Sequence, residues 1–320
     1  EIIFWRVIDL DIGIELLVLG KFAIHILAAD LWNAEYHSID EGLPPNGGHG
    51  SGVNRGLELA HGLYYKVVDS DDWFDRDAYL KMLDKIKSFE VAQFPDLIIC
   101  NYVYDHLDEG IQKPMNYRNV FPTEKMCNWN TIGHFHPSQY LIMHALMFQT
   151  KVLRQSGVKL PEHTFYVDNL FSYQPLPYAK NLYYMDIDLY HYYLGREDQS
   201  VNEKVLMKRI DQQIKVNQIM TDYFVEKKSE IMGNKPLAKY MLSYLDIITT
   251  ISSILLIRIN TQESLEKKRE LLNYIRQKDK KVYRKLRYGL LGNCMNLPGK
   301  TGRWISVEGY KICQKFFGFN

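Results

Sequence analysis

A cluster of carboxylates, formed by Asp69, Asp71 and Asp72, follows directly after the apolar run LYYKVV. Like charges so close in the chain repel one another, so a fold that gathers them normally supplies a cation, a base or bulk water. Alternate side chains of an extended segment point to the same side, so Asp69 and Asp71 can share one ligand. Hard oxygen ligands favour Mg²⁺ or Mn²⁺, with coordination positions left open for phosphate oxygens.

Other interpretations of this cluster stay open. A solvated turn followed by a helix cap is common, because short acidic motifs match many sequences by chance. A calcium-binding loop is disfavoured, because Phe74 stands at its sixth position, where glycine is needed, and Leu80 at the twelfth, where glutamate is needed. A phosphate-transfer enzyme would need a nucleophile or a phosphate-binding lysine beside the acids, and Lys66 is the nearest lysine in the sequence.

The glycine-rich segment GGHGSGVNRG lies shortly before the acids. It contains no GxGxxG, because Val53 and Arg55 interrupt the pattern, and it lacks the GK[ST] of a P-loop, so a Rossmann dinucleotide site is disfavoured. The glycines still permit a turn that approaches a ligand closely, and Asn46 and Asn54 offer amide hydrogen bonds. A flexible loop is the alternative.

Regular elements must position these side chains. Helical spacing of apolar residues predicts a helix over 51–61, ended by a left-handed Gly62, and the run LYYKVV predicts a strand. Asp75 is placed to cap a helix over 76–89 with Ala78, Met82 or Leu83, and Ile86 as its inner stripe, and DLIICNYVY predicts the next strand. Further on, Gly157 is placed to end another helix, and NLYYMDIDLYHYYLG predicts a closing strand or pair of strands. This alternation indicates an α/β fold with a largely parallel sheet, in which ligands bind at the carboxyl ends of strands, where Asp69 falls.

The composition of the chain bounds its class. With 320 residues, of which 46% are hydrophobic, the chain can fill a substantial core. Lys and Arg number 39 against 38 Asp and Glu, so the net charge of +1 does not predict a polyanionic partner across the whole surface. The four cysteines lack CxxC spacing, which favours reduced thiols in a cytosolic protein over disulfides or a zinc site.

Neither apolar stretch of the sequence predicts a membrane span. The N-terminal run EIIFWRVIDLDIGIELLVLG opens with an acid and contains further charges, so we do not expect a signal peptide. Residues 244–259 are too few to cross a bilayer and include Asp246, so a buried helix is expected there. Beyond residue 200 the pattern is helical to about 290, which predicts a division into residues 1–200 and a helical region over 201–320.

The order of these motifs resembles the family 2 glycosyltransferases of the GT-A fold, whose pattern runs through Asn-x-Gly elements, Ala-x-Gly-x-Tyr, a short strand and Asp-x-Asp-Asp. The resemblance covers about residues 46–200 and rests on Asn46, Gly48, Asn54, Gly56, Ala60, Gly62, Tyr64 and the three acids. It implies a Rossmann-like, mainly parallel mixed sheet flanked by helices, followed here by a helical C-terminal extension. It also implies a metal held by Asp69, Asp71 and Asp72, with donor contacts at Asn46, Gly48, Asn54 and Asp69.

Two later segments fit the same family pattern. LPEHTFYVDNLF is similar to its acid segment, which makes Asp168 the expected general base, although Val167 stands where the family usually has glutamate. YYMDIDLYHYYLGREDQSV is similar to its closing segment, with matches at Tyr190, Tyr192, Arg196 and Ser200. By analogy with some GT-A enzymes, His191 is a further candidate metal ligand, although a histidine on an aromatic strand is more often packed or hydrogen-bonded.

The resemblance implies an inverting transfer of a sugar from a nucleotide diphosphate, expected to be UDP, to a hydroxyl of a glycan or lipid-linked acceptor in cell-envelope or surface polysaccharide synthesis, with Mn²⁺ or Mg²⁺. Against the family pattern we expect the first strand to be missing or replaced, with EIIFWRVIDLDIG in the place of the second strand and Asp9 or Asp11 standing for the nucleotide-contacting Asp. A catalytically silent nucleotide-sugar or carbohydrate-binding protein on the same fold is the alternative.

The C-terminal part contains a basic helical stretch over about residues 266–290. Such a stretch can rest on anionic lipid, and a solvated cationic helix face is its alternative. We expect a cytoplasmic protein with peripheral contact at the inner face of the membrane. Nucleic acid is not an expected partner, because the net charge is balanced and no nucleic-acid-binding motif is present.

Overall fold

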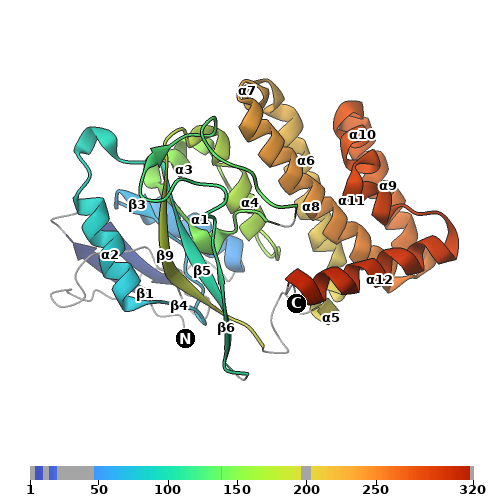
Figure 1. Cartoon of the computed structure of the whole chain (residues 1–320), viewed down its shortest axis with the longest axis horizontal. Helices are drawn as coiled ribbons and strands as arrows, with labels where there is room; N and C mark the ends of the chain where they lie inside the picture. The colour runs from blue at the N-terminus through green and yellow to red at the C-terminus, as the bar shows by residue number, and fades with distance from the viewer. Residues whose placement is uncertain are drawn as a thin grey trace. The chain divides into compact units, whose positions relative to one another are not determined.

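The computed structural model describes the backbone of Phe4–Asp9 and Ile14–Leu19 and residues 47–317, apart from Asp108, Ser138 and 196–202 (Figure 1). The chain divides into two compact units. The first comprises Glu1–His134 and Leu141–Gly195, and the second comprises Phe135–Tyr140 and Arg196–Asn320. The acids and Asp168 belong to the first unit, and the basic stretch belongs to the second.

A mixed sheet forms the centre of the first unit, with the strand order β3-β8-β5-β9-β4, while β6 pairs with β5 and β7 with β9. The strands are β3 (Tyr64–Tyr65), β4 (Trp73–Phe74), β5 (Leu97–His106), β6 (Ile111–Met115), β7 (Met126–Cys127), β8 (Leu146–Gln149) and β9 (Leu182–Tyr193). The expected strand LYYKVV is therefore regular only at its start, and the long strand expected at DLIICNYVY is present as β5.

Strand directions differ from the expected, largely parallel sheet. Among the named strands of this sheet, the pair β5 and β9 is parallel, whereas β8 is antiparallel to both β3 and β5, and β4 is antiparallel to β9. Because β8 opposes both of its neighbours, β3, β5 and β9 all run in one direction. Their carboxyl ends meet at the same edge as the amino ends of β4 and β8, which decides what lies beside Asp69.

The described part of the N-terminal region is a separate two-stranded antiparallel sheet. β1 (Phe4–Asp9) pairs with β2 (Ile14–Leu19), with Asp9 opposite Ile14. Its apolar residues therefore form a hairpin of strands at the place where the sequence suggested one strand of the family fold.

Helices connect the strands of the first unit. α2 (Arg76–Lys87) begins at Asp75, whose side chain accepts a hydrogen bond from the Ala78 N–H, and its inner residues Ala78, Met82, Leu83 and Ile86 are buried, as the sequence predicted. The other elements are α1 (His49–Leu59), η1 (Val91–Gln93), η2 (Met143–Ala145), α3 (Thr150–Ser156), α4 (Asp168–Tyr173) and η3 (Leu176–Tyr178).

The first helix differs from its prediction at both ends. α1 begins at His49 rather than residue 51 and ends at Leu59, where the C-cap Ala60 is extended. Gly62 does not take the predicted left-handed conformation, whereas Gly48, directly before the helix, has a positive φ of 78°. The glycine segment thus starts α1 rather than forming a flexible loop. Gly157 does end α3 in the left-handed conformation, as expected.

The second unit is helical, as predicted beyond residue 200. Its helices are α5 (Glu203–Lys208), α6 (Ile210–Glu226), α7 (Lys228–Met232), α8 (Lys235–Ile259), α9 (Gln262–Lys278), α10 (Lys280–Tyr288), α11 (Leu290–Met295) and α12 (Gly299–Phe317). α8 is long and apolar enough to cross a membrane by length and composition. However, 72% of its apolar 18-residue stretch is buried inside the structure, as in a core helix. This agrees with the buried helix expected there.

A polar seam joins α6 and α8. The Asn217 amide donates to Thr249 Oγ1 at 3.1 Å and to Ser252 Oγ at 3.4 Å, and all three residues are buried. Buried hydrogen bonds of this kind are costly to mispair, so they favour one register of the two helices.

Candidate functional site

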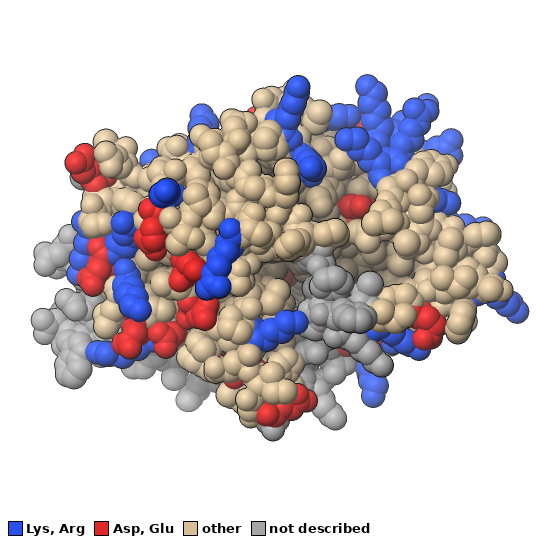
Figure 2. Space-filling model, viewed as in Figure 1, with Lys and Arg blue, Asp and Glu red and all other residues tan. Residues whose placement is uncertain are grey.

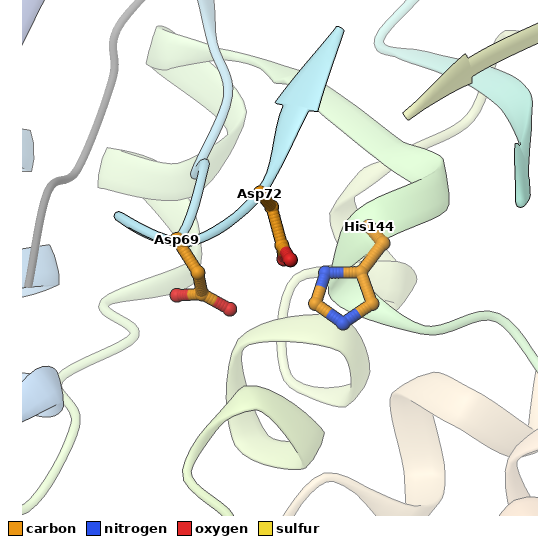
Figure 3. Close-up of side chains that lie close together, drawn as sticks. All are labelled: Asp69, Asp72 and His144. Carbon is orange, nitrogen blue, oxygen red and sulfur yellow. The ribbon is translucent and has the colours of Figure 1, made fainter. Parts of the chain in front are cut away.

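Two carboxylates and one imidazole lie together at the shared sheet edge of the first unit. Asp69, Asp72 and His144 each offer a ligand atom, and these atoms all lie within 4.8 Å of one another. Figure 3 shows both carboxyl groups beside the His144 ring. Asp69 follows β3, Asp72 precedes β4, and His144 lies in η2 just before β8. The antiparallel course of β8 therefore brings His144 to the acids, although it is far from them in sequence.

The end of β9 holds Asp72 in place. The Tyr190 hydroxyl donates to Asp72 Oδ2 at 2.5 Å, and the Tyr193 N–H donates to Asp72 Oδ1 at 2.9 Å. The same Tyr190 oxygen accepts from the Asp69 N–H at 3.1 Å. Burial, with the charge of Asp69, raises the pKa of Asp72 to about 8. The protein thus positions this carboxyl group while disfavouring its negative charge.

Asp69 also lies beside a histidine at the start of α1. Its Oδ1 lies 3.5 Å from Nδ1 of His49. Burial raises the pKa of Asp69, His49 opposes the shift and the charge of Asp71 adds to it. Nε2 of His49 is buried and has no hydrogen-bond partner among the described residues.

His144 is held as a neutral ring. It stacks on Tyr190 with a centroid distance of 4.6 Å and lies 4.3 Å from the Tyr192 ring. Burial, with Lys66 nearby, lowers the pKa of His144 to about 3. Its Nδ1 is buried without a hydrogen-bond partner in the described structure. A neutral imidazole with a free buried nitrogen is the form that binds metal ions.

Lys66 fixes the segment that carries His144. Its buried ammonium donates to the carbonyl oxygens of Met143, His144 and Leu146, and it lies 5.1 Å from the centroid of the Tyr190 ring. Burial lowers the pKa of Lys66 to about 7. Because these donors are used by the backbone, Lys66 has a structural role, which weakens the phosphate-transfer interpretation.

Asp168 lies at the start of α4, where its charge interacts with His49 and Asp69. Burial raises the pKa of Asp168 to about 6; Asp69 raises it further, while His49 and the backbone N–H groups of Asp168 and Asn169 lower it. A carboxylate with this pKa is ionised at neutral pH and still accepts a proton readily, as a general base must.

Asn54 and the glycines connect α1 to the segment before Asp168. The Asn54 amide nitrogen donates to the Leu160 carbonyl, and its oxygen accepts from the Leu160 N–H, both at 2.8 Å. A Cβ on Gly50 would lie 2.7 Å from the Pro161 oxygen, so this close packing requires glycine. The structure gives Asn54 a positioning role, and its contact with a donor stays a prediction.

The remaining predicted site residues lie elsewhere. Nδ1 of His191 is 3.0 Å from Oδ2 of the buried Asp105, and the ring stacks on Trp73, so it is outside the group of ligand atoms found in the described residues. Asp71, which is partly buried like Asp69 and Asp72, is also outside that group. Asn46 lies outside the described residues, as do Arg196, Ser200 and the side chain of Asp9.

The sequence did not single out His144 or His49. The glycine segment did contain a signal for His49, because a histidine directly after a positive-φ glycine begins a helix there. His144 carried no comparable local signal, since its place depends on the pairing of β8.

The residues of this site fit a divalent metal. Two carboxylates whose pKa values are raised by burial need a neighbouring positive charge, and the unpaired nitrogen of His144 completes a mixed oxygen and nitrogen donor set. Carboxylate oxygens suit Mg²⁺ or Mn²⁺, and an imidazole nitrogen is a common ligand of transition metals.

Known proteins match the region that builds this site. Residues 43–147 match the family model described as Glycosyl transferase family 2. A protein of Bacillus subtilis (strain 168), named "Putative glycosyltransferase EpsH", is 25% identical over 163 residues, which cover 46% of this chain and 42% of that protein. The matched part therefore spans less than half of that relative. These matches confirm the family 2 resemblance and, with the mixed α/β unit, the GT-A fold class.

Proposed function

Starting from the family 2 match at residues 43–147, we propose that the chain is an inverting glycosyltransferase. It moves a sugar from a nucleotide diphosphate, with UDP as the leading candidate, to a hydroxyl of a glycan or lipid-linked acceptor in cell-envelope or surface polysaccharide synthesis. The observation that carries this proposal is the convergence of Asp69, Asp72 and His144 in a unit that also holds Asp168 close to Asp69.

The metal is part of the proposal. Asp69, Asp72 and His144 would hold Mn²⁺ or Mg²⁺, with Asp71 as a further candidate ligand. When bound, the ion would neutralise negative charge on the leaving diphosphate. The Tyr190 and Tyr193 hydrogen bonds to Asp72 support this role, because they orient the carboxyl group before any ion arrives.

Asp168 acts on the acceptor in this proposal. It removes the proton from the attacking hydroxyl while the acceptor oxygen forms a bond to the anomeric carbon and the bond from that carbon to the diphosphate oxygen breaks. Attack from the face opposite the diphosphate inverts the anomeric configuration. His49 lies 3.5 Å from Asp69 and acts electrostatically on both Asp69 and Asp168, in the direction that favours their ionised forms.

The same proposal includes donor contacts at Asp9, Asn46 and Gly48. It also includes a cytoplasmic location, with the acceptor at the membrane. Gly48 supports the proposal because it places no side chain at the start of α1, where helix N–H groups favour anions. The sequence expectation of a donor contact through Asp69 is kept, because its carboxyl group is shared between His49 and the proposed metal.

A donor screen tests the function. The chain is incubated with Mn²⁺ and UDP-, GDP- or dTDP-sugars, with and without candidate acceptors, and released nucleotide diphosphate is measured. We expect release with one donor class and its loss in Asp69→Asn, whereas Asp77→Asn, an exposed acid of α2, should keep it. Tight UDP and Mn²⁺ binding by calorimetry without release from any donor would instead support the silent binding protein.

A further inference from the structure

The second unit contains a segment with cations and no acids. Residues 280–307 carry Lys280, Lys281, Arg284, Lys285, Arg287, Lys300 and Arg303 and no Asp or Glu. Figure 2 shows Lys and Arg side chains gathered over α10. The neighbouring helix α9 differs, because Lys267, Arg269 and Lys278 all form ion pairs with Asp or Glu. Three cations of α9 are therefore paired with acids, whereas residues 280–307 contain cations and no acids to pair with them.

Cations from three helices also meet here. Nζ of Lys268 on α9 donates to the Asn296 side chain at 2.7 Å. Burial, with the charges of Arg287 on α10 and Arg303 on α12, lowers the pKa of Lys268 to about 8. α12 is held against α11 by a hydrogen bond from Ser306 Oγ to the Cys294 carbonyl. Like charges held together by the fold indicate that an anion is expected between them.

Large apolar side chains are exposed beside these cations. Leu290 is 76% exposed, Trp304 64% and Tyr288 61%, and Ile305 next to Trp304 is also exposed. Tyr288 and Leu290 flank the end of α10 directly after Arg287, and Trp304 follows Arg303 in the chain. Leaving such side chains in water forgoes apolar burial of about 25 cal/mol per Å², which is why exposed apolar groups mark interaction surfaces.

We propose that this basic apolar surface, formed by Lys268, residues 280–290 and residues 300–305, binds the anionic surface of a lipid bilayer. The cations contact lipid phosphates, and Tyr288, Leu290 and Trp304 enter the boundary between headgroups and acyl chains. Charge complementarity selects an anionic partner. The aliphatic Leu290 and Ile305 favour lipid over nucleic acid, because acyl chains bury branched aliphatic side chains whereas bases stack mainly on aromatic or guanidinium planes.

Vesicle co-sedimentation tests this surface with the whole chain. Vesicles of phosphatidylcholine alone are compared with vesicles that also contain phosphatidylglycerol. We expect binding to the mixed vesicles only, weakened by added salt. The double variant Arg287→Gln/Arg303→Gln should lose on the order of tenfold or more in vesicle affinity, from about fivefold per cation near a charged membrane. The triple variant Lys280→Gln/Lys281→Gln/Lys285→Gln, all exposed, should lose at least as much.

Matched controls separate the surface from general effects. Arg269→Gln removes a cation that is already paired with Glu266, and Leu80→Ser removes an exposed apolar side chain of the first unit; both should bind as the native chain. Leu290→Ser/Trp304→Ser should weaken binding, and the fluorescence shift on vesicle binding should be lost in Trp304→Phe. Asp168→Asn should bind normally, which separates the lipid contact from the transfer reaction.

Three outcomes would overturn the proposal. The first is equal binding to vesicles with and without phosphatidylglycerol. The second is unchanged affinity in both cation variants while their melting temperatures match the native chain. The third is vesicle binding that does not depend on Leu290 or Trp304 and is displaced by a soluble polyanion, which would assign the cations to such a partner.

Discussion

Each unit contains a cluster of charged side chains of one sign, but the two clusters differ in their exposure to solvent. In the first unit Asp69 and Asp72 are packed against Tyr190 and His144, and burial raises the pKa of each carboxyl group. In the second unit the cations of residues 280–288 are mostly exposed. Like charges that are withdrawn from water are best stabilised by a compact ion of opposite sign at a defined position. Exposed like charges are screened by salt and can contact an extended surface of opposite charge.

The second unit also contains a single carboxylate that is partly withdrawn from water. Asp246 on α8 is a partly buried carboxylate, and its Oδ1 has no hydrogen-bond partner among the described residues. Burial alone raises the pKa of Asp246 to about 6. No other acid or histidine joins it in a group with metal-binding geometry within the described residues. Asp246 therefore shows how burial disfavours an ionised carboxylate when no metal-binding group offsets the loss of hydration.

The largest expected effect comes from Asp168. Asp168→Asn removes the proton acceptor while keeping a side chain of nearly the same size, so kcat should fall roughly 10²- to 10⁴-fold. Donor KM and metal affinity should change little, because Asp168 is not among the proposed ligands. Steady-state kinetics with the donor found in the screen measure both. Native turnover in this variant would remove Asp168 from the mechanism.

The next effect distinguishes two histidines. His144→Phe keeps a ring that can stack on Tyr190 and Tyr192 but removes the nitrogen, so Mn²⁺ affinity should fall roughly 10- to 100-fold, the range seen when groups that support a metal site are lost. Calorimetry of Mn²⁺ in the presence of UDP measures it.

His191→Phe is the matched control for that experiment, because His191 also stacks on an aromatic ring but contacts Asp105. If Mn²⁺ affinity falls in His191→Phe and not in His144→Phe, the ligand predicted from the sequence is right and the group at the sheet edge is not the metal site.

A smaller effect is expected from pH. Asp168 must be ionised to accept a proton, and its pKa is raised to about 6 by burial. The value of kcat/KM should therefore be constant above that pH and fall about tenfold per pH unit below it. The residual activity of Asp168→Asn should lack this limb. A limb near pH 4 in the native enzyme would contradict the buried setting of the carboxylate.

The smallest effect concerns stability in the second unit. The folded-state pKa of Asp246 lies above its ordinary value, so its favourable contribution is present in acid and is lost as pH rises through about 6. Asp246→Asn should therefore stabilise the protein by on the order of 1 kcal/mol at pH 8 and have little effect at pH 4. Denaturant unfolding at both pH values measures this. The exposed Asp77→Asn is the control, and equal gains at both pH values would contradict the electrostatic cause.

Local signals allowed much of the fold to be predicted. Asp75 was identified as a cap because Asp accepts from the N–H groups of a first helical turn, and Gly157 as a helix end because glycine adopts positive φ without strain. The apolar runs at β5 and β9 were recognised as strands because the pattern of a strand depends only on residues that are neighbours in the chain.

Strand direction and the cap of α1 were predicted wrongly. The sequence pattern of a buried strand is the same in parallel and antiparallel pairs. The antiparallel direction of β8 could therefore not be predicted from its residues. The expected left-handed Gly62 is instead a buried residue whose carbonyl accepts from Thr150 Oγ1 at 2.6 Å. A distant partner decided its conformation.

By itself, the sequence predicted glycosyl transfer and singled out part of the candidate site. Asp69, Asp71, Asp72 and Asp168 are recognisable because their order and spacing match a known pattern. Only the tertiary structure decided that His144 joins Asp69 and Asp72, that His49 contacts Asp69 and that His191 contacts Asp105 instead. The physical reason is strand pairing: hydrogen bonds between strands bring together residues far apart in the chain, and their register is set by the packing of the whole sheet.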